Sequence, residues 1–339
     1  WQQPVLASTM PRFLQFKIIN SAYTMYTNAL LNKAGHFSAM EGGMGGLAGT
    51  QDQRIAAHQF YFKFFTATDT LELAQFGGAQ VTTCNDIQHY EPSAQNASAK
   101  CTQFNQQHGA ITHFDANIYG AISGFTEADV TTANGEYEDN TYGWLYQLAK
   151  SFVVTGNTTA VLAQKERIPA AIAHAASLIT SEKFHIPGPA SNTYDDFWEL
   201  PLDAYVASMY PMVMHSSAIL ARAIVTRTNI LRCSDNFSSR NVSCGQGNRS
   251  LAAQCDAAAQ AAGRDFVAAL YNGKFFAYGA QLNGSGRADD VMFSGMLAGQ
   301  MLSRHAGFGD LPAMPFDAFR SSMREQLVTH VANSYGFYP

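Results

Sequence analysis

The sequence predicts an all-α fold. Helical periodicity recurs along most of the 339 residues, whereas alternating apolar and polar strand patterns are scarce and short. Successive helices are separated either by short turns or by long polar segments, which favours paired layers of helices with the long segments gathered on one rim. A ring of six such pairs is an (α/α)6 toroid, and we expect a single domain over residues 1–339.

About eight amphipathic stretches predict the helices. They occupy residues 13–32, 51–76, 142–155, 158–181, 201–227, 251–271, 290–304 and 316–332. A ring of six pairs needs twelve helices, so either further helices lie in the polar segments or residues outside this chain complete the ring. We expect chemistry in the polar segments, because loops longer than about 15 residues usually carry function. These segments are residues 33–50, 77–107, 109–140, 184–200 and 233–249.

Composition and charge exclude several kinds of partner. The apolar fraction of 47% is enough for a large core, and the net charge is -5 with scattered Lys and Arg, so no basic stripe can neutralise a phosphate backbone. Nucleic acid is therefore not an expected partner. No apolar run approaches the roughly 20 residues that span a bilayer, so no transmembrane segment is expected. Because the chain opens at Trp1, we expect a processed or partial chain.

Two features favour a secreted or lumenal compartment. Asn-x-Ser/Thr sequons lie in loop-like stretches, where a glycan can be attached. They are Asn96, Asn157, Asn236, Asn241, Asn248 and Asn283. The cysteines cluster in two regions, which suits disulfides in an oxidising compartment. They are Cys84, Cys101, Cys233, Cys244 and Cys255.

The cysteine pattern leaves two alternatives open and argues against a metal. With an odd count, one thiol is free or pairs outside this chain, and buried free thiols throughout are the alternative. No Cys-x-x-Cys pair occurs, and the His, Cys and carboxylate spacings show no metal-ligand pattern. We therefore expect neither a metal nor another cofactor.

A glycine-rich segment with one carboxylate is the first candidate site. Glu41 lies between apolar residues and Gly42 and Gly43. Burial can tune an acid at such a place, and glycines let a ligand approach the backbone closely. A flexible turn with a solvated Glu41 is the alternative. The glycines are not a phosphate cradle, because no Gly-Lys-Ser/Thr follows them.

Aromatic residues alternate with carboxylates in the second candidate site. Tyr194, Asp195, Asp196 and Trp198 have the character of a sugar site, because carboxylates accept hydrogen bonds from hydroxyls and aromatic faces stack on a pyranose. In the alternative interpretation, one of the acids of this segment, which runs to Asp203, caps the following helix, and Trp198 packs in the core.

Two further segments carry candidate acids and bases. His113 and several carboxylates lie in residues 109–142, where burial and neighbours can tune a general acid or base. Asp289 and Asp290 run into a predicted helix, whose N-terminus favours an ionised carboxylate, so helix capping is the alternative there. A serine hydrolase is excluded, because no Gly-x-Ser-x-Gly elbow is present.

Short motifs occur in one order along nearly the whole chain. They are Met10-Pro11, Phe37-Ser38-Ala39-Met40-Glu41-Gly42, Asp52 with Tyr61, Gly109-Ala110-Ile111-Thr112-His113, Glu138-Asp139-Asn140 with Thr155-Gly156-Asn157, Thr193-Tyr194-Asp195 with Ala204-Tyr205, Asn272-Gly273-Lys274-Phe275-Phe276, Val291-Met292 and Ala298-Gly299-Gln300. In this order they resemble motifs of glycoside hydrolase family 116, the non-lysosomal glucosylceramidase and β-glucosidase family. The resemblance implies an (α/α)6 barrel without the family's N-terminal β-sandwich and last barrel helices.

The resemblance also implies a mechanism. Members of the family are retaining enzymes with a Glu nucleophile and an Asp acid/base, whose carboxyl groups lie roughly 5 to 5.5 Å apart. The match implies that Glu41 is the nucleophile and that Asp52 and His113 contact the sugar. The family's acid lies between Val-Met and Ala-Gly-Gln, where this sequence has no carboxylate, so the nearest candidates are Asp289 and Asp290.

Three hypotheses follow from the sequence. The first is a secreted glycoside hydrolase-like protein that acts on a β-glucoside or related glycan through two carboxylates. The second is a catalytically inactive, hydrolase-derived glycoprotein with a glycan-binding or extracellular structural or assembly role. In either case we expect that a further chain or segment can complete the barrel. The third, a lyase or epimerase, needs a base such as His113, His185 or Tyr194 beside the sugar ring.

Overall fold

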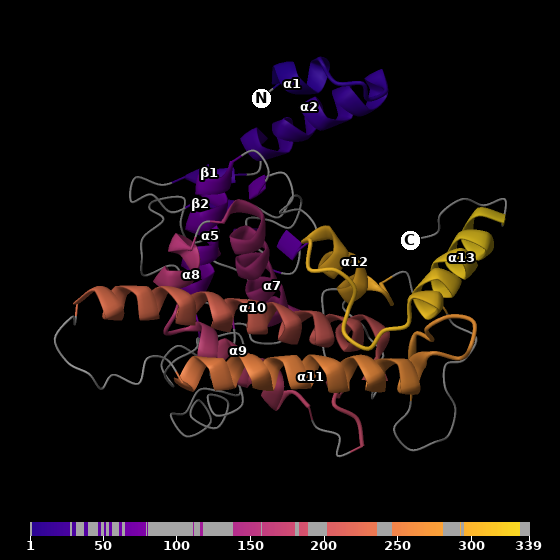
Figure 1. Cartoon of the computed structure of the whole chain (residues 1–339). Helices are drawn as coiled ribbons and strands as arrows, with labels where there is room; N and C mark the ends of the chain where they lie inside the picture. The colour runs from indigo at the N-terminus through magenta and orange to yellow at the C-terminus, as the bar shows by residue number, and fades with distance from the viewer. Residues whose placement is uncertain are drawn as a thin grey trace. The chain divides into compact units, whose positions relative to one another are not determined.

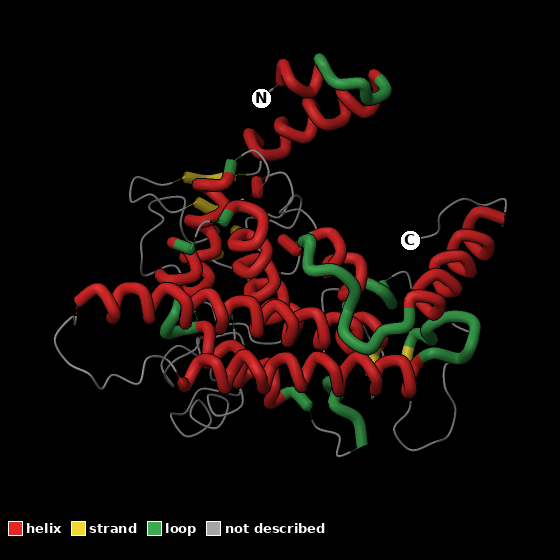
Figure 2. Tube along the Cα trace, viewed as in Figure 1, coloured by secondary structure: helices red, strands yellow, loops and turns green. Residues whose placement is uncertain are grey.

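The computed structural model of the chain is mainly helical, which confirms the all-α class (Figure 2). It describes residues 2–27, 29–31, 37–39, 47–48, 51, 54–55, 61–62, 65–78, 80, 111, 116–117, 138–156, 158–179, 183–188, 202–235, 246–280, 292 and 295–332. The chain divides into two compact units, Trp1–Glu136 and Tyr137–Pro339, which are described in turn (Figure 1).

The first unit opens with two helices, α1 (Gln2–Leu6) and α2 (Arg12–Thr27). The Gln15 side chain closes the turn between them, because its Nε2 donates to the Ser8 and Met10 carbonyls at 3.0 and 2.9 Å. Pro11 stands immediately before α2, a position where its missing N–H costs no helical hydrogen bond.

Two short antiparallel strand pairs follow α2. β1 (Ala29–Leu31) pairs with β2 (Phe37–Ala39), and β3 (Leu47–Ala48) pairs with β4 (Ala116–Asn117). The prediction of a helix over residues 13–32 is therefore wrong at its end. The side chains of Ala29, Leu30 and Leu31 suit either a helix or a strand, and the pairing with β2 decides for the strand.

The predicted helix 51–76 is interrupted. The described residues 51, 54–55 and 61–62 are helical, Phe65 is not, and α5 (Thr66–Gly78) begins after it. The threonines here bond to nearby carbonyls, as the Thr68 hydroxyl does to Phe65 at 2.8 Å. The N–H groups of Thr68 and Asp69 also donate to the Phe65 carbonyl, so α5 starts immediately after Phe65.

The second unit is built around α7 (Glu138–Thr155), a helix that is buried over most of its length. Every residue of α7 from Asp139 to Ser151 is buried, so this helix has no solvated face over those residues. It packs against α9 (Ile168–Ser177) and α10 (Ala204–Asp235). The core of the unit therefore lies along α7.

The long helix α10 also packs against α11 (Gln246–Leu270) and α12 (Ala298–His305). Figure 1 shows α10 and α11 side by side along much of their length. The predicted segment 233–249 is thus partly helical at both ends, because α10 runs to Asp235 and α11 begins at Gln246.

Single residues explain where one predicted helix of this unit ends and where another divides in two. α7 ends at Thr155 because Gly156 follows with a φ of 68°, which glycine adopts without strain. The predicted helix 158–181 is two helices, α8 (Thr159–Ala163) and α9, separated by a turn. Pro169 lies in the first turn of α9, where proline can begin a helix but not continue one.

Of the last two predicted helices, one is partly wrong and the other agrees with the structure. The prediction for 290–304 is wrong in its first half, because the turn Gly295–Leu297 precedes α12 and Met292 forms a β-bridge with Ala277. The prediction for 316–332 is confirmed by α13 (Phe316–Ala332).

A small β-ladder connects the chain on either side of α10 and α11. β5 (Leu202–Asp203) pairs antiparallel with β6 (Gly279–Ala280), and the Ala204 N–H donates to the Tyr278 carbonyl at 2.9 Å. Together with the bridge from Ala277 to Met292, this ladder joins three separate parts of the sequence.

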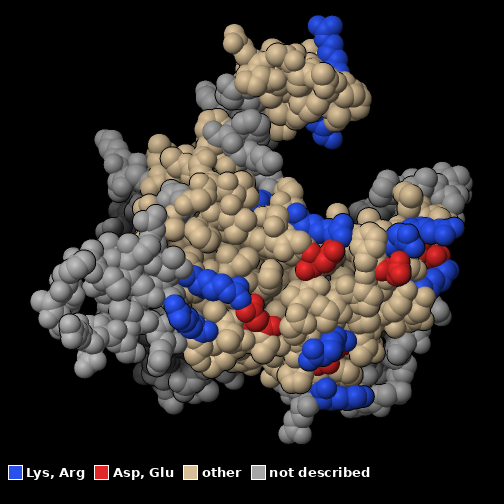
Figure 3. Space-filling model, viewed as in Figure 1, with Lys and Arg blue, Asp and Glu red and all other residues tan. Residues whose placement is uncertain are grey.

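Opposite charges are neighbours on the surface of the second unit. Lys274 pairs with Glu325 at 2.6 Å, and Arg304 pairs with Asp310 at 2.5 Å. On the face drawn in Figure 3, basic and acidic side chains accordingly lie beside one another in small groups. Among the described helices, none combines the length and the apolar character that crossing a membrane requires.

Candidate functional site

The strand β2 immediately precedes Met40 and Glu41 in the sequence, and buried side chains of α5 hold it in place. The Ala39 N–H donates to Oε1 of Glu72 at 2.8 Å, and Gln75 Nε2 donates to the Ser38 hydroxyl at 3.1 Å. Glu72 and Ser38 are fully buried. The end of β2 is therefore held by α5.

The same Glu72 belongs to a buried ionic cluster with Arg54 and Asp69. Arg54 Nε donates to Oε2 of Glu72, and Arg54 Nη2 donates to Oδ1 of Asp69 at 2.6 Å. Burial works to lower the pKa of Arg54, but the Glu72 and Asp69 carboxylates outweigh it and raise the pKa above its ordinary value. The guanidinium is charged, and removing one partner would leave a buried charge unpaired.

Glu72 therefore connects two candidate segments that are distant in the sequence. One of its oxygens binds Ala39, two residues before Glu41, and the other binds Arg54, two residues after Asp52. Both candidates come from the sequence motifs, and the described residues beside each of them contact the same carboxylate. The contacts of Glu72 with Ala39 and Arg54 are therefore the described part of the candidate site in the first unit.

Tyr61 packs against the beginning of the same strand. Its ring lies 5.5 Å from that of Phe37 in an edge-on arrangement, and both residues are buried. Burial, with the nearby Glu72 carboxylate, raises the pKa of Tyr61 to about 12. The phenol therefore keeps its proton at neutral pH and is not a general base.

In the second unit, a buried hydrogen bond joins the starts of α7 and α10. The Tyr205 hydroxyl donates to Oδ2 of Asp139 at 3.0 Å, and both residues are buried. Asp203 caps α10, because its Oδ1 accepts the Val206 N–H at 2.9 Å. For Asp203, the capping interpretation of the acidic segment is thus confirmed.

The described ends of three connecting stretches of chain lie together at this point. One segment leads into α7 at Glu138, the second leads into β5 at Leu202, and the third leaves β6 at Ala280 and returns to the ladder at Met292. The Tyr205 hydrogen bond connects the first of these places to the second, and the pairing of β5 with β6 connects the second to the third.

The Ala-Gly-Gln motif has a structural role. The Gly299 N–H donates to the Ser208 hydroxyl at 3.1 Å, and a Cβ at Gly299 would overlap the Ser208 carbonyl, so glycine allows α12 to approach α10. Gln300 fixes the loop after α12, because it donates to Asp310 at 2.5 Å and accepts the Leu311 N–H at 2.8 Å.

The Asn-Gly-x-Phe-Phe motif forms a tight turn between α11 and the ladder. Asn272 Oδ1 accepts the N–H groups of Lys274 and Phe275 at 3.0 and 2.9 Å, and Gly273 has a φ of 96°. Phe276 then stacks on Phe266 with ring centroids 4.5 Å apart. The turn formed by this motif therefore directs the chain from α11 towards β6, the strand that pairs with β5.

The proposed catalytic and sugar-binding side chains lie outside the described residues, and their roles stay predictions. They are Glu41, Asp289 and Asp290 for catalysis, and Asp52, His113, Tyr194, Asp195, Asp196 and Trp198 for sugar binding. The structure describes residues close to some of them in sequence, such as Ile111, which is buried two residues before His113.

Cys255 is a buried free thiol. It is 2% exposed, and burial raises its pKa to about 11. Its inclusion among the disulfide candidates is therefore corrected, and it fits the single free thiol that an odd count allows. Cys233 lies in the last turn of α10, and Cys84, Cys101 and Cys244 lie outside the described residues.

One of the six sequons is not in a loop. Asn248 lies in the first turn of α11, which corrects the expectation of a loop at this position. The helix begins earlier than the apolar pattern indicated, because its first turn is polar. The other five sequons lie outside the described residues, namely Asn96, Asn157, Asn236, Asn241 and Asn283.

Sequence reasoning missed the buried charges of the first unit. Asp69 and Glu72 stand three residues apart on α5, and both are fully buried. Two carboxylates at this spacing share one face of a helix, and apolar residues such as Leu73 and Phe76 lie close to them in sequence. That combination is the signal that could have revealed a buried cationic partner.

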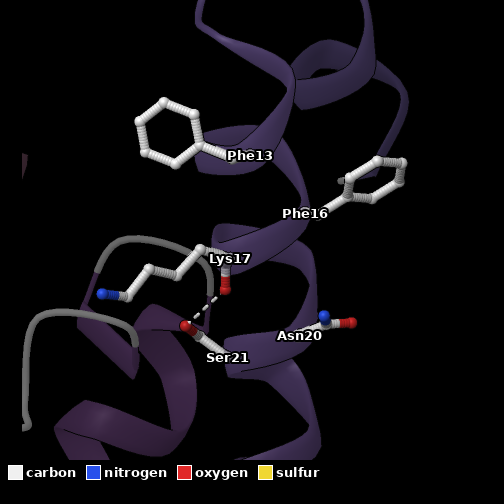
Figure 4. Close-up of a pocket in the computed structure, with 5 residues that line it drawn as sticks. All are labelled: Phe13, Phe16, Lys17, Asn20 and Ser21. Carbon is white, nitrogen blue, oxygen red and sulfur yellow. Dashed lines mark hydrogen bonds between the residues drawn. The ribbon is translucent and has the colours of Figure 1, made fainter.

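An open depression lies along α2, apart from these contacts (Figure 4). Its lining consists of two phenylalanines, an amine, an amide and a hydroxyl, namely Phe13, Phe16, Lys17, Asn20 and Ser21. The Ser21 hydroxyl donates to the Lys17 carbonyl at 2.8 Å. The described residues of this lining include no carboxylate, so they do not supply the pair of acids that glycoside hydrolysis uses.

Within the described part of the chain, no group of three or more His, Cys, Asp or Glu side chains is arranged to hold a metal ion.

In comparisons with known proteins, no family model matches the chain, and no curated protein matches it.

Proposed function

We propose that this chain is a secreted or lumenal glycoside hydrolase-like protein that acts on a β-glucoside or related glycan. Its helices would form an (α/α)6 toroid of the kind found in glycoside hydrolase family 116, either complete or closed by a further segment. Glu41 is the nucleophile in this proposal, and Asp289 or Asp290 is the acid. Asp52, His113 and the segment from Tyr194 to Trp198 bind the sugar.

One observation carries the proposal. Glu72 binds both Ala39 and Arg54, so the parts of the chain beside Glu41 and Asp52 share one buried anchor. A nucleophile and a sugar-binding carboxylate must be held together with little freedom, and rigid elements provide this better than independent loops. The contacts of the buried Glu72 carboxylate therefore support the assignment of Glu41 and Asp52 to one site.

The proposed reaction has two steps. The Glu41 carboxylate attacks the anomeric carbon, the bond from that carbon to the leaving oxygen breaks, and the aspartic acid gives its proton to that oxygen. The same aspartate then takes a proton from water, whose oxygen attacks the anomeric carbon and releases Glu41. Each of the two displacements inverts the anomeric carbon, so the anomeric configuration is retained overall.

The decisive experiment compares Glu41→Gln with the wild type on nitrophenyl glycosides of both anomers. We expect kcat on a β-glucoside to fall about 1,000-fold or more in Glu41→Gln, because the amide cannot act as the nucleophile. Glu166→Gln is the matched control, since that side chain is 86% exposed on the surface of the second unit. Circular dichroism verifies that both variants are folded.

A second measurement identifies the nucleophile directly. A 2-deoxy-2-fluoro-β-glucoside with a good leaving group should form a stable ester, which peptide mass spectrometry should locate on Glu41. Undiminished hydrolysis by Glu41→Gln, a label on another residue, or no hydrolysis by the wild type of any glycoside tested contradicts the proposal.

A further inference from the structure

One face of α2 is exposed and largely apolar. Gln15 lies on the other face, because it is buried and donates to the turn between α1 and α2. Since about 3.6 residues make one turn of a helix, Phe13 and Lys17 lie on the side opposite Gln15. Phe16 and Leu14 flank them, and these four residues form the outer face of α2. Phe13 is 69% exposed and Phe16 is 49% exposed, so neither ring belongs to the core of the first unit.

The outer face is open. The depression along α2 includes Phe13, Phe16 and Lys17 in its lining. Figure 4 shows the two rings projecting to different sides of the helix, so neither ring closes over the other. A small-molecule site encloses most of the surface of its ligand, whereas a group of exposed apolar side chains is typical of a face that binds a protein or a membrane. The partner that fits the outer face is therefore itself a surface.

The charges around this face are all positive. Residues 1–40 contain three Lys or Arg and no Asp or Glu, although the whole chain has a net charge of -5. The Arg12 guanidinium lies 5.9 Å from the centroid of the Phe16 ring, so one positive charge stands at the edge of the outer face. Lys17 supplies a second charge on the face itself. The electrostatic complement of the outer face is a negatively charged surface.

Association of two outer faces with each other does not provide that complement. In a two-fold dimer both copies use the same patch, so the outer face would meet a second outer face. Arg12 and Lys17 would then approach the same cations of the other copy, and α2 carries no carboxylate to compensate them.

A lipid bilayer with anionic head groups does provide it. Aromatic rings that point in different directions can enter the interfacial region, because the lipids rearrange around them. The negative charge of the head groups attracts nearby Lys and Arg side chains. An acidic protein, in contrast, would need a surface shaped for each ring.

We propose that the outer face of α2 binds a membrane surface that carries anionic head groups. In the bound state α2 lies in the plane of the interface, Phe13 and Phe16 enter between the head groups, and the two cations stay at the level of the lipid phosphates. The helix lies on the bilayer and does not cross it. This inference goes beyond the proposed function and does not depend on it.

Co-flotation of the full chain with vesicles tests the inference. One set of vesicles is phosphatidylcholine alone, and the other contains about 30% phosphatidylserine. We expect binding to the anionic vesicles to be at least about 10-fold tighter than binding to phosphatidylcholine, because each Lys or Arg near such a surface contributes a factor of about 5. Higher salt should weaken the binding, since it screens the attraction between the cations and the head groups.

Substitutions on the outer face separate the two contributions. Phe13→Ala combined with Phe16→Ala should weaken binding to the anionic vesicles about 10-fold or more, because the apolar area that enters the interface is lost. Lys17→Gln should weaken it about 5-fold. Leu327→Ala and Lys165→Gln are the matched controls, since Leu327 is 59% exposed on α13 and the Lys165 side chain is 48% exposed. We expect neither control to change the binding, and thermal unfolding establishes that all variants are folded.

Hydrogen exchange locates the contact on the chain. We expect peptides from residues 12–21 to exchange more slowly in the presence of anionic vesicles and peptides from α13 to be unaffected.

Three results would overturn the inference. The first is no binding to the anionic vesicles, and the second is equal binding to both kinds of vesicle. The third is an equal loss of binding in the controls and in the outer-face variants. Binding to dextran sulfate without binding to vesicles also overturns it, because the cations would then recognise an acidic polymer and not a lipid surface.

Discussion

Substitution of Gly299 by alanine should destabilise the second unit, because the new methyl group has no room. The Cβ would overlap the Ser208 carbonyl of α10, and the nearest atoms are all backbone. Backbone of a packed helix cannot rotate away as a side chain can, so the cost lies near the upper end for overpacking, about 3 kcal/mol. Alanine's better helix propensity returns about 1 kcal/mol, which leaves a net loss of about 2 kcal/mol.

Urea unfolding followed by circular dichroism measures this loss, and thermal unfolding should show a midpoint lower by about 4 to 8 °C. Gly78→Ala is the control, since a Cβ at Gly78 meets nothing within 4 Å. We expect that control to be unchanged or more stable by about 0.5 kcal/mol. A Gly299→Ala variant as stable as the wild type would show that α10 and α12 do not approach as closely as the structure indicates.

Two further predictions concern titratable groups of the second unit. Burial, partly offset by Asp256, lowers the pKa of His215 below 6.5. The unfolded chain therefore binds a proton at this histidine more readily than the folded chain does. The resulting contribution to the stability of the folded state is complete above pH 6.5 and is lost as the pH falls through the folded pKa. The free energy of unfolding should therefore drop less between pH 7 and 5 in His215→Gln than in the wild type, and equal drops would contradict this. Burial raises the pKa of Cys255 to about 11, so iodoacetamide at pH 8 should leave this thiol unmodified in the native protein and alkylate it in urea, as peptide mapping measures. Rapid alkylation of Cys255 in the native protein would mean that the thiol is accessible.

Local pattern was sufficient to predict the helical class and several helices. Residues 316–332 form a helix between the bounds that the pattern predicted, and α7 differs from the prediction mainly at its start. Such stretches need only periodicity and an end signal, as Gly156 provides for α7. The cap of α10 by Asp203 was likewise predictable, because the acid stands directly before the helix.

Long-range pairing decided what local pattern did not. Ala29–Leu31 has helix-compatible residues and became a strand because β2 lies opposite. Met292 stands in a stretch with a helical pattern and instead bridges Ala277. In both cases backbone hydrogen bonds to a distant partner outweigh a weak local preference.

The sequence by itself determined that the chain is helical, and it predicted Glu41 and Asp52 as candidate catalytic and sugar-binding residues in separate segments. Only the tertiary structure revealed that Glu72 binds the residues beside both of them. The spacing of Asp69 and Glu72 beside apolar residues hints at their burial, but the cation that pairs with them was not readable from the sequence, because Arg54 lies 15 and 18 residues away. Charge pairing over such a separation is set by how the helices pack, which no local pattern encodes.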